Sequence, residues 1–275
     1  MTERLDLTQT TFIIPLCIES EDRAQNAEIV LSYLCKHLKT NIVVYEYDKG
    51  QSKLAPILGK IDQGETKILH RFEENKTGNS MFYRTRFLNQ MLFENVNTPV
   101  CVNYDIDILL DTAAYAKCQE FILGGHDLIY PYFWGDSQWQ VFKSGREKIK
   151  QTLSLGGLEA KDKNLTRSEY GHLQYLNSDV YRKFGGEDEN MLSYGCEDLL
   201  RGQRFQKLGR CVVWSSFYVY HLEHFRSPQS NNKNPMFGHN EKHAAFIKSL
   251  NPDELRSYYE NADYLKKYKG AFNAI

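Results

Sequence analysis

Two aspartates, Asp105 and Asp107, end the apolar run of residues 99–108 and have the spacing of a metal-binding pair. The run is rich in Val and Ile and predicts a buried strand. Residues two positions apart on a strand point to the same face, so the two carboxylates would lie side by side. Such a pair repels itself unless a cation, typically a divalent metal, lies between the carboxylates. A lone Asp-x-Asp is more often a strand that leaves the sheet through a polar turn, so the rest of the chain must decide.

The elements that must position this pair alternate between strands and helices. We predict strands at residues 11–18, 41–48, 66–72, 99–108 and 127–132, and helices at 23–38, 83–96 and 111–123. This order predicts an α/β protein with a mostly parallel central sheet that is covered by helices on both faces. Ligands bind beyond the carboxyl ends of the strands in such sheets, which is where Glu46, Asp48, Asp105 and Asp107 would lie.

The second half of the chain is less regular. We predict helices at residues 144–155, 178–184, 196–209, 239–250 and 252–268, the last with Asn251 as its N-cap. A strand at 211–214 would continue through 217–224, and residues 156–171 would form a loop. The length supports one large α/β domain, residues 1–245, followed by a short helical extension, residues 246–275.

Composition excludes several classes of function. The formal net charge of −1 over 275 residues gives no bulk attraction to nucleic acid or to anionic lipid. The first residues carry no apolar leader, and no apolar run is long enough to cross a membrane. The 6 cysteines form no Cys-x-x-Cys pair and are expected to be reduced, which together predicts a cytoplasmic protein with peripheral membrane contact at most.

Four features follow one another along the chain. They are an apolar strand with Pro15, an acidic strand end at Glu46, the Asp105/Asp107 pair, and a segment with Gly185-Gly186, Glu197-Asp198 and then His221. In this order they resemble GT-A-type nucleotide-sugar glycosyltransferases, and among these the bacterial family 2 transferases, chondroitin polymerase domains and β-1,4-galactosyltransferases. The resemblance spans roughly residues 10–245. It departs from the family at Glu46-Tyr-Asp48, where Asp-Asp-Gly-Ser is common, and at Cys196, where a glycine is usual.

The resemblance implies a GT-A (Rossmann-like) fold and a metal site for Mn²⁺, with Mg²⁺ as the alternative. Asp107 would bind the metal, and Asp105 would reach the ribose or the metal through water. His221 would supply a nitrogen ligand, with His224 as its rival, and imidazole favours Mn²⁺ over Mg²⁺. Outside this constellation each histidine reads as a packed or exposed polar side chain.

The resemblance also implies donor-binding positions. Glu46 resembles the carboxylate that reads uracil or ribose, and its alternative is a solvated strand end. Arg86 would contact the diphosphate or the base, whereas its alternative, shared with Arg84, is the polar face of an amphipathic helix. The implied donor-binding residues are Pro15, Glu46, Arg86, Asn89, Asp105, Asp107 and Gly186.

The resemblance gives Asp198 the role of general base, which takes the proton of the acceptor hydroxyl. Glu197 and Tyr194 would contact the acceptor or the donor sugar, and acids at a helix start also complement the helix dipole. The implied activity is a metal-dependent, inverting transfer of a sugar from a UDP-sugar to a glycan or glycolipid acceptor. The alternatives are a retaining transferase of the same fold and a non-catalytic protein that binds nucleotide sugars or glycans. The sugar and the acceptor would be selected around Tyr194, Trp134 and Trp139.

Overall fold

The computed structural model describes residues 3–76, 81–133, 135, 137–167, 170–227 and 230–268. Its larger sheet has seven strands in the order β10-β6-β9-β4-β1-β2-β3. All neighbours in it are parallel except β9, which is antiparallel to both β4 and β6. The predicted mostly parallel α/β sheet is therefore confirmed. The strands are β1 (Leu5–Leu16), β2 (Leu38–Asp48), β3 (Lys67–Glu74), β4 (Val100–Tyr104), β6 (Leu128–Tyr130), β9 (Leu173–Asn177) and β10 (Val212–Trp214).

A smaller, four-stranded sheet has the order β5-β11-β7-β8. Its strands are β5 (Ile108–Leu110), β7 (Gln138–Val141), β8 (Lys163–Leu165) and β11 (Val219–Leu222). The prediction that residues 217–224 continue the strand at 211–214 was wrong, because the backbone changes partners between them. Ser215 N still bonds to Tyr130 O beside β6, whereas Val219 N bonds to Ser137 O beside β7. The predicted loop at 156–171 contains β8, which lies on the edge of this second sheet.

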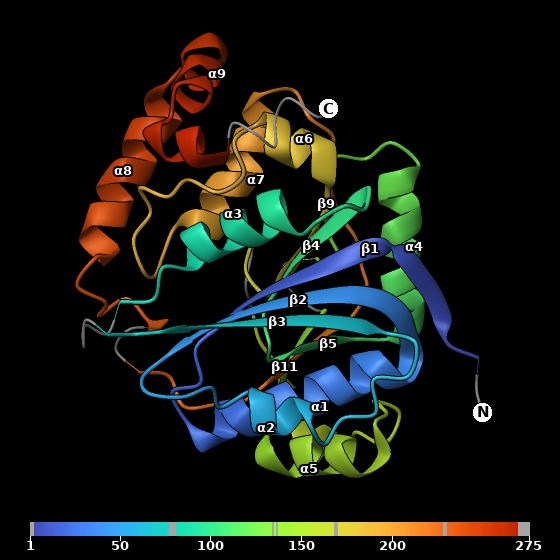
Figure 1. Ribbon diagram of the computed structural model, residues 1–275. Helices are drawn as coiled ribbons and strands as arrows, with labels where there is room; N and C mark the ends of the chain where they lie inside the picture. Colours follow the sequence, from blue (N-terminus) through green and yellow to red (C-terminus); the bar gives the residue numbers. More distant parts are fainter. Residues whose placement is uncertain are drawn as a thin grey trace.

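Helices lie on both sides of the larger sheet (Figure 1). They are α1 (Glu21–His37), α2 (Ala55–Leu58), α3 (Arg84–Glu94), α4 (Thr112–Leu123), α5 (Lys143–Thr152), α6 (Ser178–Lys183), α7 (Glu197–Lys207), α8 (Phe237–Ser249) and α9 (Pro252–Glu260), with 3₁₀ turns at Ala160–Asp162 and Asp263–Tyr268. In Figure 1, α3, α6 and α7 lie above the sheet, and α1, α2 and α5 lie below it. The helix predicted at 252–268 is therefore two segments.

Local signals in the sequence explain where two of these helices begin. The Ser20 side chain accepts a hydrogen bond from Arg23 N at the start of α1. At the start of α9, Asn251 forms a capping box with Glu254, and Pro252 occupies the first turn. Asn251 is thus the N-cap that the sequence predicted.

The chain packs around two apolar clusters. The larger one fills the space between the sheets and their helices. The smaller one joins α7, α8 and α9 and consists of Phe184, Met191, Leu200, Leu208, Ala244, Ile247, Leu255 and Tyr259. The predicted boundary between residues 245 and 246 falls inside α8. No helix within the described residues is long and apolar enough to span a membrane.

Candidate metal centre and active site

Asp105 and Asp107 lie in the turn that connects β4 of the larger sheet to β5 of the smaller one. The expectation that they share one face of a single strand was therefore wrong, because the chain passes from one sheet to the other between them. Antiparallel pairing of β5 with β11 sets His221 opposite Ile108. Leu222 N also donates to Asp107 O at 2.8 Å. The pairing of β11 with β5 thus brings His221 next to the turn that carries Asp105 and Asp107.

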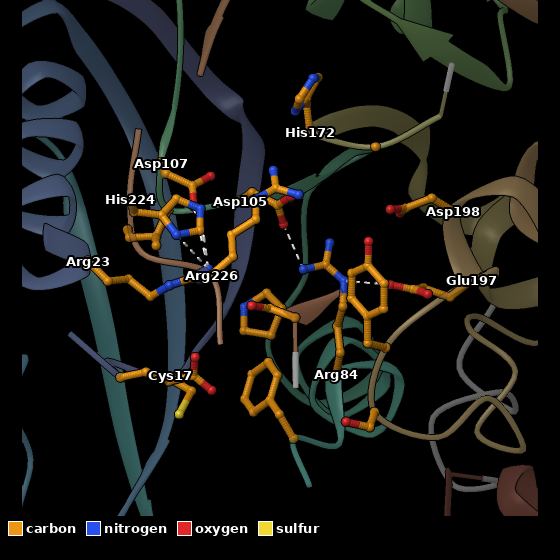
Figure 2. Close-up of a pocket in the computed structure, with 18 of the residues that line it drawn as sticks. Cys17, Arg23, Arg84, Asp105, Asp107, His172, Glu197, Asp198, His224 and Arg226 are labelled. Atoms are coloured by element: carbon orange, nitrogen blue, oxygen red, sulfur yellow. Dashed lines mark hydrogen bonds and ion pairs between the residues drawn. The ribbon is translucent and has the colours of Figure 1, made fainter. Parts of the chain in front are cut away.

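Asp107, His221 and His224 form one cluster of potential metal ligands. One ligand atom from each lies within 4.8 Å of the others. His224 Nε2 is 3.0 Å from Asp107 Oδ2, and His221 Nε2 is 3.7 Å from Asp107 Oδ1. The sequence left His221 and His224 as alternatives, whereas the structure brings both to the same carboxylate. Figure 2 shows Asp107 and His224 together on one side of the pocket.

The hydrogen bonds of the two histidines leave their Nε2 atoms facing Asp107. His221 Nδ1 lies 2.8 Å from Gln140 Oε1, and His224 Nδ1 lies 2.8 Å from Phe225 O. Both partners are acceptors, so each Nδ1 is assigned as a donor, and Nε2 of each ring faces the carboxylate with a lone pair or a proton. The atom that lies between each Nε2 and the Asp107 carboxylate must carry positive charge, as a proton or a metal ion does. This donor set therefore fits a divalent metal, and the outer hydrogen bonds are those that orient metal ligands.

Charge and burial in the cluster agree with this fit. Burial lowers the pKa of His221 to about 3, although Asp107 opposes the shift, so the ring stays neutral near neutral pH. Burial alone would raise the pKa of Asp107, but the hydrogen bond from His224 and the charges nearby hold it well below its usual value. Arg23 supplies one of these charges, with Nη2 3.8 Å from Asp107 Oδ2.

Glu197 and Asp198 form a second acidic pair, in the first turn of α7. Figure 2 shows both side chains entering the pocket from the side opposite Asp107. Burial raises the pKa of Glu197 to about 7, and the neighbouring charge of Asp198 adds to the shift while Arg84 opposes it. The Asp198 side chain keeps 21% of its surface exposed. Glu197 can therefore carry a proton at neutral pH, whereas the Asp198 carboxylate remains open to solvent.

Arg84 connects the two acidic pairs. It begins α3, and its Nη1 lies 2.6 Å from Asp105 Oδ1 while its Nε lies 3.5 Å from Glu197 Oε1. Burial raises the pKa of Asp105, although Arg84 opposes the shift and Asp107 adds to it. Arg84 thus contacts one acid of each pair and leaves Asp107 and Asp198 for other partners (Figure 2).

These side chains line one pocket of about 230 Å³. The predicted residues that line it are Pro15, Asp105, Asp107, Tyr194, Glu197, Asp198, His221 and His224. Arg84, which the sequence placed equally well on a solvated helix face, lines it too. Trp139 is not part of this lining, and Trp134 lies outside the described residues.

The remaining predicted donor-binding residues lie away from the pocket. Glu46 is fully buried, and its carboxylate accepts from Ser52, from the backbone of Lys53 and Leu54, and pairs with His70. Arg86 pairs with Glu73 instead of facing the pocket. Both side chains are therefore committed to neighbours of β2 and β3 in this structure.

Asn89 and Gly186 also support the fold from outside the pocket. Asn89 Oδ1 accepts from Glu187 N at 2.7 Å, and its Nδ2 donates to Glu187 O at 2.9 Å. Gly186 has φ of +61°, and a Cβ there would collide with Asn89 Oδ1. The two residues hold the loop that precedes α7.

Sequence reasoning missed Arg23, His172 and Arg226, which line the same pocket. His172 has φ of +72°, and its Nε2 lies 3.1 Å from Gln138 Oε1. Arg226 lies two residues beyond His224 and is exposed. Proximity to the predicted ligands was an available signal for Arg226, whereas nothing in the local sequence marks Arg23 or His172.

Comparison with known proteins supports the fold. No protein-family model and no curated sequence matches the chain. A solved mannosyltransferase, PcManGT from Pyrobaculum calidifontis in complex with GDP-Man and Mn²⁺, matches at 12% identity over 99% of this chain and 75% of its own, with a TM-score of 0.54. GalNAc-T7 with UDP, GalNAc and Mn²⁺ matches at 13% identity over 96% of this chain and 54% of its own, with a TM-score of 0.55.

A third match is weaker. The catalytic domain of Drosophila β1,4-galactosyltransferase 7, in complex with xylobiose, aligns at 11% identity over 80% of this chain and 71% of its own. Its TM-score of 0.43 is too low to carry an argument. At these identities the first two matches establish architecture alone. The chain has the GT-A fold that glycosyltransferases use.

Proposed function

We propose that this protein is a metal-dependent glycosyltransferase that moves a sugar, with inversion, from a UDP-sugar to a glycan acceptor. The observation that carries the proposal is one pocket that holds both a three-ligand metal cluster and a second acidic pair. A GT-A architecture makes sugar transfer the first reaction to consider for such a pocket, and the two groups of acidic side chains support it.

The side of the pocket with Asp107, His221 and His224 would receive the nucleotide diphosphate. Asp107, His221 and His224 would hold a divalent metal, Mn²⁺ by our proposal, which would supply positive charge beside the leaving diphosphate. Arg23 and Arg226 line the same pocket, and each adds a cation that can pair with phosphate oxygens.

The side with Glu197 and Asp198 would receive the acceptor. Asp198 takes the proton of an acceptor hydroxyl as the oxygen bonds to the anomeric carbon of the donor sugar. The bond from that carbon to the diphosphate breaks, and its electron pair leaves with the diphosphate. Attack from the face opposite the diphosphate inverts the anomeric centre. Glu197, protonated near neutral pH, would donate a hydrogen bond to a sugar oxygen.

Thermal unfolding in the presence of nucleotide sugars tests the proposal without knowledge of the acceptor. Ligands that bind only the folded state raise its melting temperature. We expect UDP and at least one UDP-sugar to raise it with Mn²⁺ and much less with EDTA, in a panel that includes UDP-galactose, UDP-N-acetylgalactosamine and GDP-mannose. The stabilising donor should also be slowly hydrolysed in the presence of the metal.

Two outcomes would contradict the proposal. If UDP stabilises the protein equally with Mn²⁺ and with EDTA, donor binding does not depend on a metal. Metal-dependent binding without any hydrolysis or transfer would favour a protein that binds nucleotide sugars without catalysis.

A further inference from the structure

Behind Asp198 lies a buried arginine that no substrate can reach. The side chain of Arg201, one helical turn further along α7, has no exposed surface and does not line the pocket. Its Nη1 donates to Asp198 Oδ1 at 3.0 Å. We propose that Arg201 is a positioning residue that holds the Asp198 carboxylate in the orientation for proton abstraction, an inference that rests on the proposed function.

All three side-chain nitrogens of Arg201 donate hydrogen bonds, which fixes its guanidinium in one place. Its Nε and Nη2 donate to the two oxygens of Glu187 at 2.6 and 3.0 Å. Its Nη1 donates to Gln174 Oε1 at 2.5 Å in addition to Asp198. The fork-to-fork pair with Glu187 allows one orientation of the guanidinium plane.

The loop before α7 links Arg201 to helix α3. Glu187 is 2% exposed and follows Gly186, whose positive φ lets the chain approach Asn89. Asn89 then binds both the N–H and the carbonyl of Glu187. Hydrogen bonds thus connect Asn89 of α3 to Glu187, Glu187 to Arg201, and Arg201 to Asp198. The Gly-Gly segment supports this series of contacts although it does not line the pocket.

The geometry leaves one oxygen of Asp198 available for chemistry. Arg201 occupies Oδ1, and Oδ2 makes no hydrogen bond or ion pair within the described part of the chain. A base that is bound at one oxygen cannot rotate freely, so its second oxygen keeps a fixed direction into the pocket. Since misplacement of a catalytic group by about 1 Å can cost on the order of 10²-fold in rate, this orientation should matter.

The test uses Arg201→Lys, which keeps the charge but cannot hold Glu187 and Asp198 together through a planar fork. Donor hydrolysis by the full chain, with Mn²⁺ and whichever of UDP-galactose, UDP-N-acetylgalactosamine or GDP-mannose the wild type cleaves, gives kcat and KM. We expect kcat to fall on the order of 10²-fold with KM for the donor unchanged. The Mn²⁺-dependent stabilisation by UDP should also persist.

A double-mutant cycle separates positioning from general stability. If Arg201 acts through Asp198, then Arg201→Lys should cause no further loss of kcat in an Asp198→Asn background. Arg182→Gln is the control, because the buried side chain of Arg182 donates to the carbonyls of Leu92 and Val96 without touching Asp198, Glu187 or Gly186. It should lower the melting temperature and leave kcat unchanged.

The outcomes distinguish this inference from the proposed function. Unchanged kcat in Arg201→Lys, or an equal loss in both backgrounds, would overturn the positioning role. If Arg201→Lys does not fold, Glu187→Gln loosens the same fork with less change in shape and must show the same non-additivity. If the wild type neither binds UDP with Mn²⁺ nor cleaves any donor, the proposed function is wrong, and so is the role of Asp198 as general base.

Discussion

The pocket contains two acidic pairs, Asp105 and Asp107 between the sheets and Glu197 and Asp198 at the start of α7, and Arg84 contacts one acid of each. The remaining acids differ in their partners. Asp198 is bound by the fixed guanidinium of Arg201, whereas Asp107 faces the Nε2 atoms of two imidazoles, with Arg23 further away at 3.8 Å. Asp198 is thus paired with a buried cation, and Asp107 lies among residues that can bind one from solution.

This difference separates binding from catalysis. Changes on the Asp107 side should alter the affinity for metal and for nucleotide diphosphate, whereas changes at Asp198 should alter turnover.

Asp198→Asn should lower the rate of transfer or donor hydrolysis on the order of 10²- to 10⁴-fold, which is the usual contribution of a general base. The amide keeps the shape of the side chain and can still accept from Arg201, so the fold should survive. Affinity for UDP with Mn²⁺, measured by calorimetry on the same preparation, should stay near that of the wild type. If the affinity for UDP falls together with the rate, Asp198 contributes to donor binding. If transfer stays near normal, Asp198 is not the general base.

Arg84→Gln and Arg86→Gln form a matched pair on α3. Arg84 lies between two acids with only 15% of its side chain exposed, so its loss should reduce the free energy of unfolding on the order of 2–3 kcal/mol, less than a fully buried pair would cost. Arg86 is 31% exposed and pairs with a partly exposed Glu73, so its loss should cost less than about 1 kcal/mol and leave donor binding unchanged. Urea unfolding of both variants measures the difference. If Arg86→Gln lowers donor affinity more than Arg84→Gln does, Arg86 contacts the donor as the sequence predicted.

His221→Ala and His224→Ala should each weaken Mn²⁺ binding by at least the 10- to 100-fold that loss of an outer partner costs. Both rings approach the same carboxylate, so we expect comparable effects. His126→Ala is the control, because His126 bonds to Phe121 O and does not line the pocket. Titration with Mn²⁺ by electron paramagnetic resonance gives the affinities. A large effect in only one of the two would reduce the ligand set to that histidine and Asp107.

Glu197→Gln should change how stability depends on pH. Folding raises the pKa of Glu197 from 4.5 to about 7, so the folded state holds this proton more tightly than the unfolded chain does. The stabilisation is present below about pH 4.5 and is lost as the pH rises through about 7. Between pH 5 and pH 8, the melting temperature of the variant relative to wild type should therefore rise, on the order of a few degrees. If the difference in melting temperature between variant and wild type stays constant across this range, folding does not raise the pKa of Glu197.

Much of the fold was predictable because its signals are local. Apolar runs with helical or strand spacing identified the parallel sheet, and the cap at Asn251 identified the start of α9. The strands β10 and β11 could not be assigned to different sheets, since each is a short apolar run and their separation depends on which distant strand they pair with.

The candidate site was predictable where chemistry depends on residue type and order along the chain. Asp107, Glu197, Asp198 and the two histidines line one pocket. Glu46 and Arg86 do not, because their polar groups bind neighbours that are set by the pairing of β2 with β3 and by the orientation of α3. Arg23 and His172 enter the pocket from distant segments, and only the tertiary structure brings them there.

The central claim is that Asp107 belongs to a metal site to which a nucleotide diphosphate binds. The most direct test is thermal unfolding of wild type and Asp107→Ala, each with UDP in the presence of Mn²⁺ or EDTA. We expect a clear Mn²⁺-dependent rise in melting temperature with UDP for the wild type and none for the variant, with similar melting temperatures of the two proteins in EDTA alone. An equal Mn²⁺-dependent rise in Asp107→Ala would contradict the account.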